Sequence, residues 1–232
     1  MPNLGLSKEL RSLRPALVVV ALGCITMIVA SVVFWPQMAE SLVTRAANDR
    51  HGESVIQRWF AVAAFPVFLL LFSVLLGAAP VLDRKLRRLL SQKDQANTQN
   101  AVRVLGYLLA GVAVAMTVSH FGLLSAFAGE SFPLEEAMAA SLGLILILLG
   151  IAFPLARPED ETLPPFLQRF QNAVGSAYRP AAIILVTIGV ASIALAFVSA
   201  WTALLLASVG MTILFLGIIT IGLSRMHHQS GS

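Results

Sequence analysis

The segment that decides the fold spans residues 180–224, PAAIILVTIGVASIALAFVSAWTALLLASVGMTILFLGIITIGLS, in which 45 consecutive residues carry no charged side chain. As one helix it would be about 67 Å long, roughly twice the thickness of a bilayer's hydrocarbon core. The segment therefore predicts two membrane-spanning helices joined by a tight turn. Residues 199–202 are polar and aromatic and form the expected turn, with Trp201 at the depth of the membrane interface.

The rest of the chain repeats this apolar character. Of the 232 residues, 57% are hydrophobic and 12% are charged, a charged share about half that of a soluble domain. This composition argues against a disordered chain and against a water-soluble globule. Further apolar stretches of spanning length, without the strict alternation of membrane β-strands, lie at about 15–34, 59–82, 104–128 and 137–156. We therefore expect an all-α fold, a polytopic membrane bundle of six transmembrane helices.

The positions of the basic residues predict the orientation. Of the 16 Lys and Arg residues, 13 fall on one side of the six predicted spans, and such an excess marks the cytoplasmic side. Both termini are thus expected in the cytoplasm of a multi-pass cell-membrane protein. The predicted regions are a cytoplasmic tail (1–14), a two-span region (15–102) with an outside loop (35–58) and a basic inner loop (83–102), a four-span region (103–225) with an amphipathic inner helix at about 165–178, and a flexible tail (226–232).

The loops carry two groups of candidate binding residues. In the outside loop, residues 37–48 predict a short helix with apolar side chains on one side, and the candidate binding residues are Glu40, Arg45, Asp49 and His51. The inner loop carries Arg84, Lys85, Arg87 and Arg88, which either anchor the topology or bind anionic lipid of the inner leaflet, at about 1 kcal/mol each. The predicted inner helix places Phe166 and Phe170 on the face expected to lie on the inner membrane surface.

Within the spans, small residues at helical spacing predict which faces point into the bundle, because lipid offers no hydrophobic drive and helices associate by close packing. Three such stripes occur. They comprise Gly106, Ala110, Ala113, Thr117 and His120 in the third span, Glu136, Ala140, Gly143, Ile147, Gly150 and Pro154 in the fourth, and Pro66, Leu70, Ser73, Gly77 and Pro80 in the second, ending at Asp83.

His120 is the only ionisable side chain well inside a predicted span, and such groups are candidate functional residues. The alternative is a neutral histidine that is hydrogen-bonded across the bundle, with Ser119 or Ser125 nearby. Asp83, at the end of the second-span stripe, and Glu136, at the start of the fourth-span stripe, are further candidates for the bundle interior. The single cysteine, Cys24, is expected to face lipid or a neighbouring helix and excludes an intrachain disulfide.

No nucleophile elbow, zinc-protease motif, CxxC motif, Walker A loop or dinucleotide fingerprint occurs in the sequence. We therefore expect no enzymatic activity, no cofactor and no metal site. The basic residues lack the aromatic partners of a nucleic-acid groove, so no nucleic-acid partner is expected.

The layout resembles the SdpI-type immunity-protein family, six-span membrane proteins with an N-terminal two-span domain of unknown function. The resemblance rests on residues 149–158, LGIAFPLARP, at the exit of the fourth span, on residues 38–45 of the outside loop, and on a histidine late in the third span. It implies immunity against a secreted peptide toxin and a signalling role that holds a repressor at the membrane.

Three functions stay open at this point. The first is a non-enzymatic binding or signalling protein whose outside loop meets a peptide or envelope partner. The second is a small transporter with a polar route near His120. The third is an accessory subunit whose small-residue stripes pack against a larger membrane complex.

Overall fold

The computed structural model describes residues 3–45, 53–89, 98–156 and 165–230. Six of the described helices are long and apolar enough to cross a membrane, which confirms the predicted all-α membrane bundle. These helices are α1 (Asn3–Phe34), α2 (Arg58–Leu89), α3 (Thr98–Ala128), α4 (Leu134–Ala152), α6 (Tyr178–Ala196) and α7 (Ala200–Ser230). The shorter elements are η1 (Trp35–Gln37), β1 (Ser41–Arg45), β2 (Ser54–Gln57), η2 (Phe153–Ala156), α5 (Pro165–Val174) and η3 (Gly175–Ala177).

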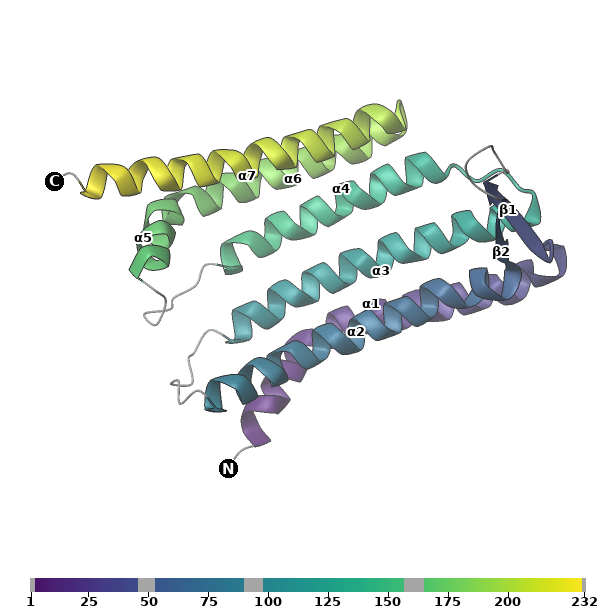
Figure 1. The fold of residues 1–232 in the computed structure, drawn as a ribbon, viewed down its shortest axis with the longest axis horizontal. Coiled ribbons are helices and arrows are strands. Elements are labelled where there is room, and N and C mark those ends of the chain that lie inside the picture. The colour runs from purple at the N-terminus through teal and green to yellow at the C-terminus, as the bar shows by residue number, and fades with distance from the viewer. Residues whose placement is uncertain (1–2, 46–52, 90–97, 157–164, 231–232) are drawn as a thin grey trace.

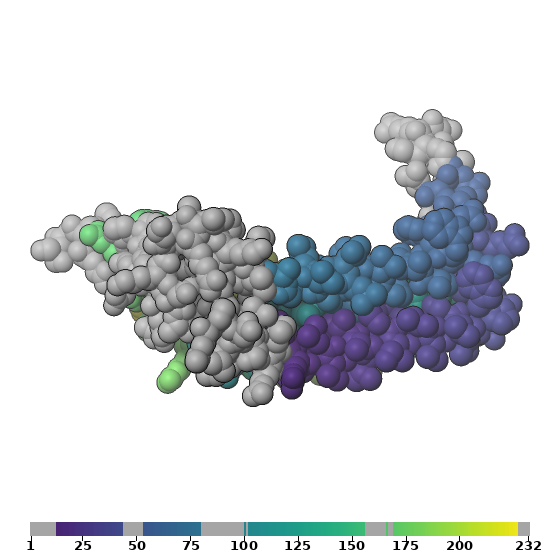
Figure 2. All heavy atoms as spheres, turned by 90° about the horizontal axis from the view of Figure 1, so that it is seen from below, coloured from purple at the N-terminus to yellow at the C-terminus, as the bar shows by residue number. Residues whose placement is uncertain are grey.

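The six long helices form two groups of three. Helices α1, α2 and α3 contact one another, as do α4, α6 and α7, and the groups meet where α3 packs against α4. Figure 1 shows that α1 begins and α7 ends at one end of the bundle, here called the termini end, and that α5 lies there too. The β1–β2 pair lies at the opposite end, here called the hairpin end. Figure 2 shows α1 and α2 side by side along one face of the molecule.

Helices α4 and α6 approach each other backbone to backbone. A Cβ atom added at Gly143 would lie 2.7 Å from the carbonyl oxygen of Gly189, and one added at Gly189 would lie 2.5 Å from the carbonyl oxygen of Gly143. About two turns further along, a Cβ at Gly150 would lie 2.9 Å from the carbonyl oxygen of Ala182. The two backbones touch only because neither side carries a side chain. The predicted interior positions Gly143 and Gly150 thus face α6.

The third-span stripe faces α1. A Cβ at Gly106 would meet Ala16 of α1 at 3.6 Å, and one at Gly23 of α1 would meet the Thr117 hydroxyl at 3.0 Å. His120 and Ala113 on the same stripe are buried. The prediction that this stripe points into the bundle is confirmed.

The second-span stripe is wrong at one position. Leu70 is exposed and Leu69 is the fully buried leucine, although Pro66 and Ser73 are buried as expected. A helical turn of 3.6 residues puts both neighbours near the edge of the stripe, and the packing of α2 against α1 and α3 selects Leu69.

Helices also extend further than the apolar runs predict. The N-terminal tail is helical from Asn3, the predicted basic loop is helical up to Leu89 and again from Thr98, and α7 continues to Ser230 in the predicted flexible tail. The turn between α6 and α7 lies at residues 197–199, so that Trp201 belongs to the first turn of α7. Hydropathy marks where apolar side chains begin and end, whereas a helix continues into water wherever backbone hydrogen bonds can propagate.

The predicted outside loop contains a β-hairpin where a short helix is predicted over residues 37–48. β1 and β2 pair antiparallel, with Leu42 opposite Ile56 and Val43 opposite Val55, and the register shifts between Val43 and Arg45. The β-branched residues of this segment favour strands once a partner strand is present. That partner strand, residues 54–57, lies outside the segment 37–48 whose spacing predicts a helix.

Candidate functional site

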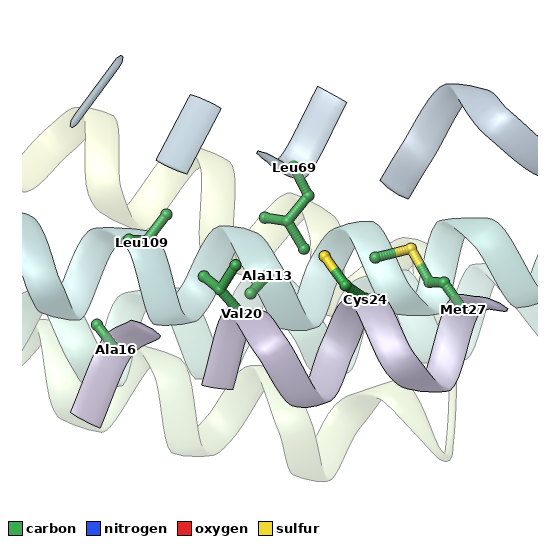
Figure 3. Close-up of a cluster of buried hydrophobic side chains, with 7 residues drawn as sticks. All are labelled: Ala16, Val20, Cys24, Met27, Leu69, Leu109 and Ala113. Atoms are coloured by element: carbon green, nitrogen blue, oxygen red, sulfur yellow. The ribbon is translucent and has the colours of Figure 1, made fainter. Parts of the chain in front are cut away.

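His120 lies fully buried between α3 and α1, at 0% exposure. It adjoins the core formed by Ala16, Val20, Cys24, Met27, Leu69, Leu109 and Ala113. Figure 3 shows α1 contributing Cys24 and Met27 to this core, with the sulfur-bearing chain of Met27 at one end of the cluster. The lone cysteine therefore faces helices. The predicted placement of His120 inside the bundle is confirmed.

The His120 ring, the Ser31 hydroxyl and the Met27 carbonyl form a closed hydrogen-bonded group, here called the node. The His120 Nε2 atom lies 2.9 Å from the Ser31 hydroxyl and 3.1 Å from the Met27 carbonyl oxygen, and the Ser31 hydroxyl donates to the same carbonyl at 2.8 Å. A carbonyl only accepts, and Ser31 has already used its single proton, so both contacts require a proton on Nε2. The ring is thereby assigned the Nε2–H form, which ties α3 to α1.

The other ring nitrogen, Nδ1, is then a lone-pair acceptor. It is buried without a hydrogen-bond partner among the described residues, and the Phe65 ring of α2 stands edge-on at 5.9 Å from the imidazole. Among residues whose burial is described, His120 is the only buried His, Lys, Arg, Asp or Glu. The node can thus fix the helices, but the described residues supply no second buried His, Lys, Arg, Asp or Glu for a proton relay.

The other two interior candidates fare differently. Glu136 is exposed in the first turn of α4, so its predicted place inside the bundle is wrong. A carboxylate there interacts favourably with the positive end of the helix dipole and with water, which burial would deny it. Asp83 lies on the helical backbone of α2, and its side chain lies outside the described residues.

A cap closes the hairpin end of the first helix group. Buried Met38 and Phe127, with Leu42 and Ile56 of the hairpin beside them, form part of one apolar cluster with α1, α2 and α3. Two main-chain hydrogen bonds fix it, from the Ala39 amide to the Phe127 carbonyl and from the Arg58 amide to the Glu40 carbonyl, both at 3.0 Å. The hairpin is therefore held as a rigid extension of the helices.

A cation–π contact joins the start of α2 to the residue that follows α1, at the base of the hairpin. The Arg58 guanidinium at the start of α2 lies 4.4 Å from the centre of the Trp35 ring, which follows α1. Such contacts contribute about 0.5–1 kcal/mol at exposed sites. The contact closes the base of the hairpin.

The candidate outside-loop residues fall partly within this cap. Glu40 is exposed directly before β1, whereas Asp49 and His51 lie outside the described residues. Arg45 ends β1, and its side chain also lies outside the described residues. The outward face of the hairpin instead presents the cross-strand pair Val43 and Val55, exposed by 52% and 44%.

At the termini end, the predicted amphipathic helix exists as α5, continued by η3. Its apolar face packs against α7, where a Cβ added at Gly222 would overlap the Phe170 ring and lie 2.8 Å from the Val174 side chain. Arg225 of α7 donates to the Ala173 carbonyl at 2.8 Å and to the Ser176 hydroxyl. Only Phe166 of the two phenylalanines is largely exposed.

The basic cluster of the predicted inner loop has a helical backbone at the end of α2. The side chains of Arg84, Lys85, Arg87 and Arg88 lie outside the described residues.

Several residues of these sites are not among the candidates that the sequence predicts. The histidine's partner is Ser31 of α1 and not Ser119, which bonds the Ala115 carbonyl and the Met138 sulfur. A signal existed in the spacing of the buried positions of α1, which recur every three or four residues and end in Ser31: Leu13, Ala16, Val20, Cys24, Met27 and Ser31. The pairing of Arg58 with Trp35 has no local signal, because the hairpin brings them together.

Comparisons with protein-family models, with curated proteins and with solved structures give no match. The resemblance to the SdpI-type family therefore stays a prediction.

Proposed function

We propose that this chain is a non-enzymatic cell-membrane protein, with both termini in the cytoplasm, that binds a peptide or envelope partner at its hairpin end and signals across the membrane. The observation that carries the proposal is the β1–β2 hairpin, fixed to three transmembrane helices and presenting an apolar pair away from them. The immunity role that the family resemblance implies is one form of this function.

The hairpin offers the backbone groups that an extended peptide needs. The Arg58 amide bonds the Glu40 carbonyl, so these two residues form a hydrogen-bonded pair and the next pair, Ser41 with Gln57, is of the other kind. By this alternation, Val55 and Gln57 direct their N–H and C=O groups away from β1. A peptide added along β2 would receive main-chain hydrogen bonds there and an apolar contact from Val55.

The same attachment gives a route for a signal. Met38 and Ala39, which lead into the hairpin, contact the end of α3, and His120 further down α3 holds Ser31 of α1. A partner that moves the hairpin would therefore act on the α1–α3 contact. At the termini end, the basic residues Arg84, Lys85, Arg87 and Arg88 are proposed to meet anionic lipid of the inner leaflet.

Site-specific photo-crosslinking in cells tests the proposal. A photoreactive residue at Val43 or Val55 should give an adduct of defined mass, whereas one at Leu42, which faces the bundle, should not. The identified peptide should then bind the purified protein in lipid nanodiscs about tenfold more weakly after Val55→Lys, a change worth roughly 1.4 kcal/mol. The control is Phe68, an exposed position within the membrane-spanning part of α2, where the same photoreactive residue should capture lipid only. An adduct that forms equally well from Phe68, or none from Val43 and Val55, would refute binding at the hairpin.

An accessory subunit is the second candidate, and one observation favours it. Helix α7 packs through one face only and leaves Leu205, Val209, Ile213 and Leu216 exposed along its length. A partner helix could cover this face in place of lipid. Extraction in mild detergent, followed by sizing of the native protein, separates a lone bundle from a stable complex.

A further inference from the structure

The turn between α6 and α7 carries the most exposed apolar side chains among the described residues. Phe197 and Val198 are exposed by 81% and 82%, and Trp201, at the start of α7, by 68%. Exposure of three such large apolar side chains to water would be unfavourable in free energy. We propose that this turn is an anchor that inserts into the lipid interface at the hairpin end, with Phe197, Val198 and Trp201 contacting the leaflet.

The backbone of the turn is built for a medium poor in water. The amides of Val198 and Ser199 both donate to the Leu195 carbonyl, at 2.9 and 2.8 Å. The Ser199 hydroxyl accepts from the Thr202 amide and hydroxyl, at 3.4 and 3.0 Å, and so caps the first turn of α7. A turn in which the Val198, Ser199 and Thr202 amides find acceptors within the chain loses less free energy on leaving water, which favours backbone at membrane depth.

Two neighbouring features fix the depth of the turn. Arg179 is exposed at the other end of α6, and the 18 residues from there to Phe197 rise about 27 Å, close to the ~30 Å hydrocarbon core. Ala139 of α4 packs against Ala196 and Ala200, so exposed Glu136, one turn earlier on α4, lies near the level of the turn. Carboxylates belong among headgroups, and the turn is therefore placed at the headgroup boundary and not at the bilayer centre.

The remaining tryptophans support the same boundary. Trp35 follows α1 and Trp59 begins α2, both exposed at the hairpin end, and together with Trp201 they are the three tryptophans of the chain. Tryptophan is enriched at membrane interfaces because its ring is apolar and its N–H is polar. The first helix group continues beyond this level as the hairpin, whereas the second ends there in lipid.

The single cysteine makes the test direct. In a Cys24→Ala background, Val198→Cys and the hairpin control Glu53→Cys are placed in pure-lipid vesicles and treated with a membrane-impermeant maleimide. Labelling of Val198→Cys should be about tenfold slower than that of Glu53→Cys, because the inserted thiol is shielded from water. Equal rates would overturn the proposal. Slow labelling in native membranes with fast labelling in vesicles would also overturn it, since a protein would then cover the turn.

Fluorescence gives a second readout that needs no cysteine. With Trp35→Phe and Trp59→Phe, emission from Trp201 should be quenched more by lipids brominated near the headgroup than by aqueous acrylamide. Replacing Phe197 and Val198 by Asp should shift that emission to longer wavelength, whereas Val43→Asp on the hairpin should leave it unchanged. Strong acrylamide quenching in the parent protein would show the turn in water.

Discussion

Substituting Gly189 by alanine tests the packing of the second helix group. The added Cβ would lie 2.5 Å from the Gly143 carbonyl oxygen and 3.0 Å from the Ile147 amide nitrogen, whereas ordinary contact begins at 3.4 Å. The Ile147 side chain, whose Cγ1 atom would lie at 2.7 Å, can rotate away, but the two backbone atoms cannot, so α4 and α6 must separate by about 0.9 Å (3.4 minus 2.5 Å) at this point. Overpacking of this kind costs about 1–3 kcal/mol, and a gap of that size forfeits a quarter to a half of the dispersion energy of the flanking contacts.

Two other glycines provide matched controls on the same fold. A Cβ at Gly77 of α2 or at Gly217 of α7 would meet nothing within 4 Å. Gly77→Ala should therefore leave the free energy of unfolding unchanged or raise it by up to ~1 kcal/mol through helix propensity. The comparison separates the steric effect at Gly189 from the general effect of adding a methyl group to a transmembrane helix.

Unfolding of the purified protein in mixed micelles with increasing SDS, followed by tryptophan fluorescence, gives the free energies. Gly189→Ala and Gly143→Ala should each unfold at lower SDS, and the double variant should lose less than their sum because both act on one contact. If Gly189→Ala were as stable as Gly77→Ala, the close approach of α4 and α6 would be wrong.

Three further changes probe the other sites. His120→Ala and Ser31→Ala should each lower the unfolding free energy by about 1 kcal/mol, non-additively in the double variant, whereas His120→Gln should retain more stability; additive losses would contradict the shared hydrogen bond. Gly222→Leu should displace Phe170 and release α5 from α7, seen as faster proteolysis of the α5 segment, and unchanged cutting would contradict the docking. A reporter fused after Arg225 should be active in the cytoplasm, and activity on the opposite side would reverse the proposed orientation.

Much of the candidate site could be predicted, because some of its physics is local. A ring as polar as that of His120 prefers protein to acyl chains, and its stripe of Gly and Ala marks the packed face of α3. The same argument misplaced Glu136, because periodicity alone does not register that a helix has only just begun there. The position of Glu136 in the first turn of α4 leaves it beside water, although it shares the face of Gly143.

The hairpin shows where a local pattern is insufficient. Residues 41–45 can be placed on a helical wheel, but they form β1 because residues 54–57 return beside them and because Leu42 and Ile56 find a common apolar cluster. Strand pairing is a contact between distant residues, and its energy is absent from either segment alone.

Hydropathy is enough to predict six membrane-spanning helices and a turn within residues 180–224, although the turn lies at 197–199 and not at 199–202. The bilayer imposes these features segment by segment, through its thickness and through the cost of burying charge. Which faces meet is a property of the packed bundle: Gly143 lies against Gly189, His120 against Ser31, and Gly222 against Phe170. A helical period says which residues share a face, but the partner of that face is chosen by the shape of the neighbouring helix, which lies far away in the chain.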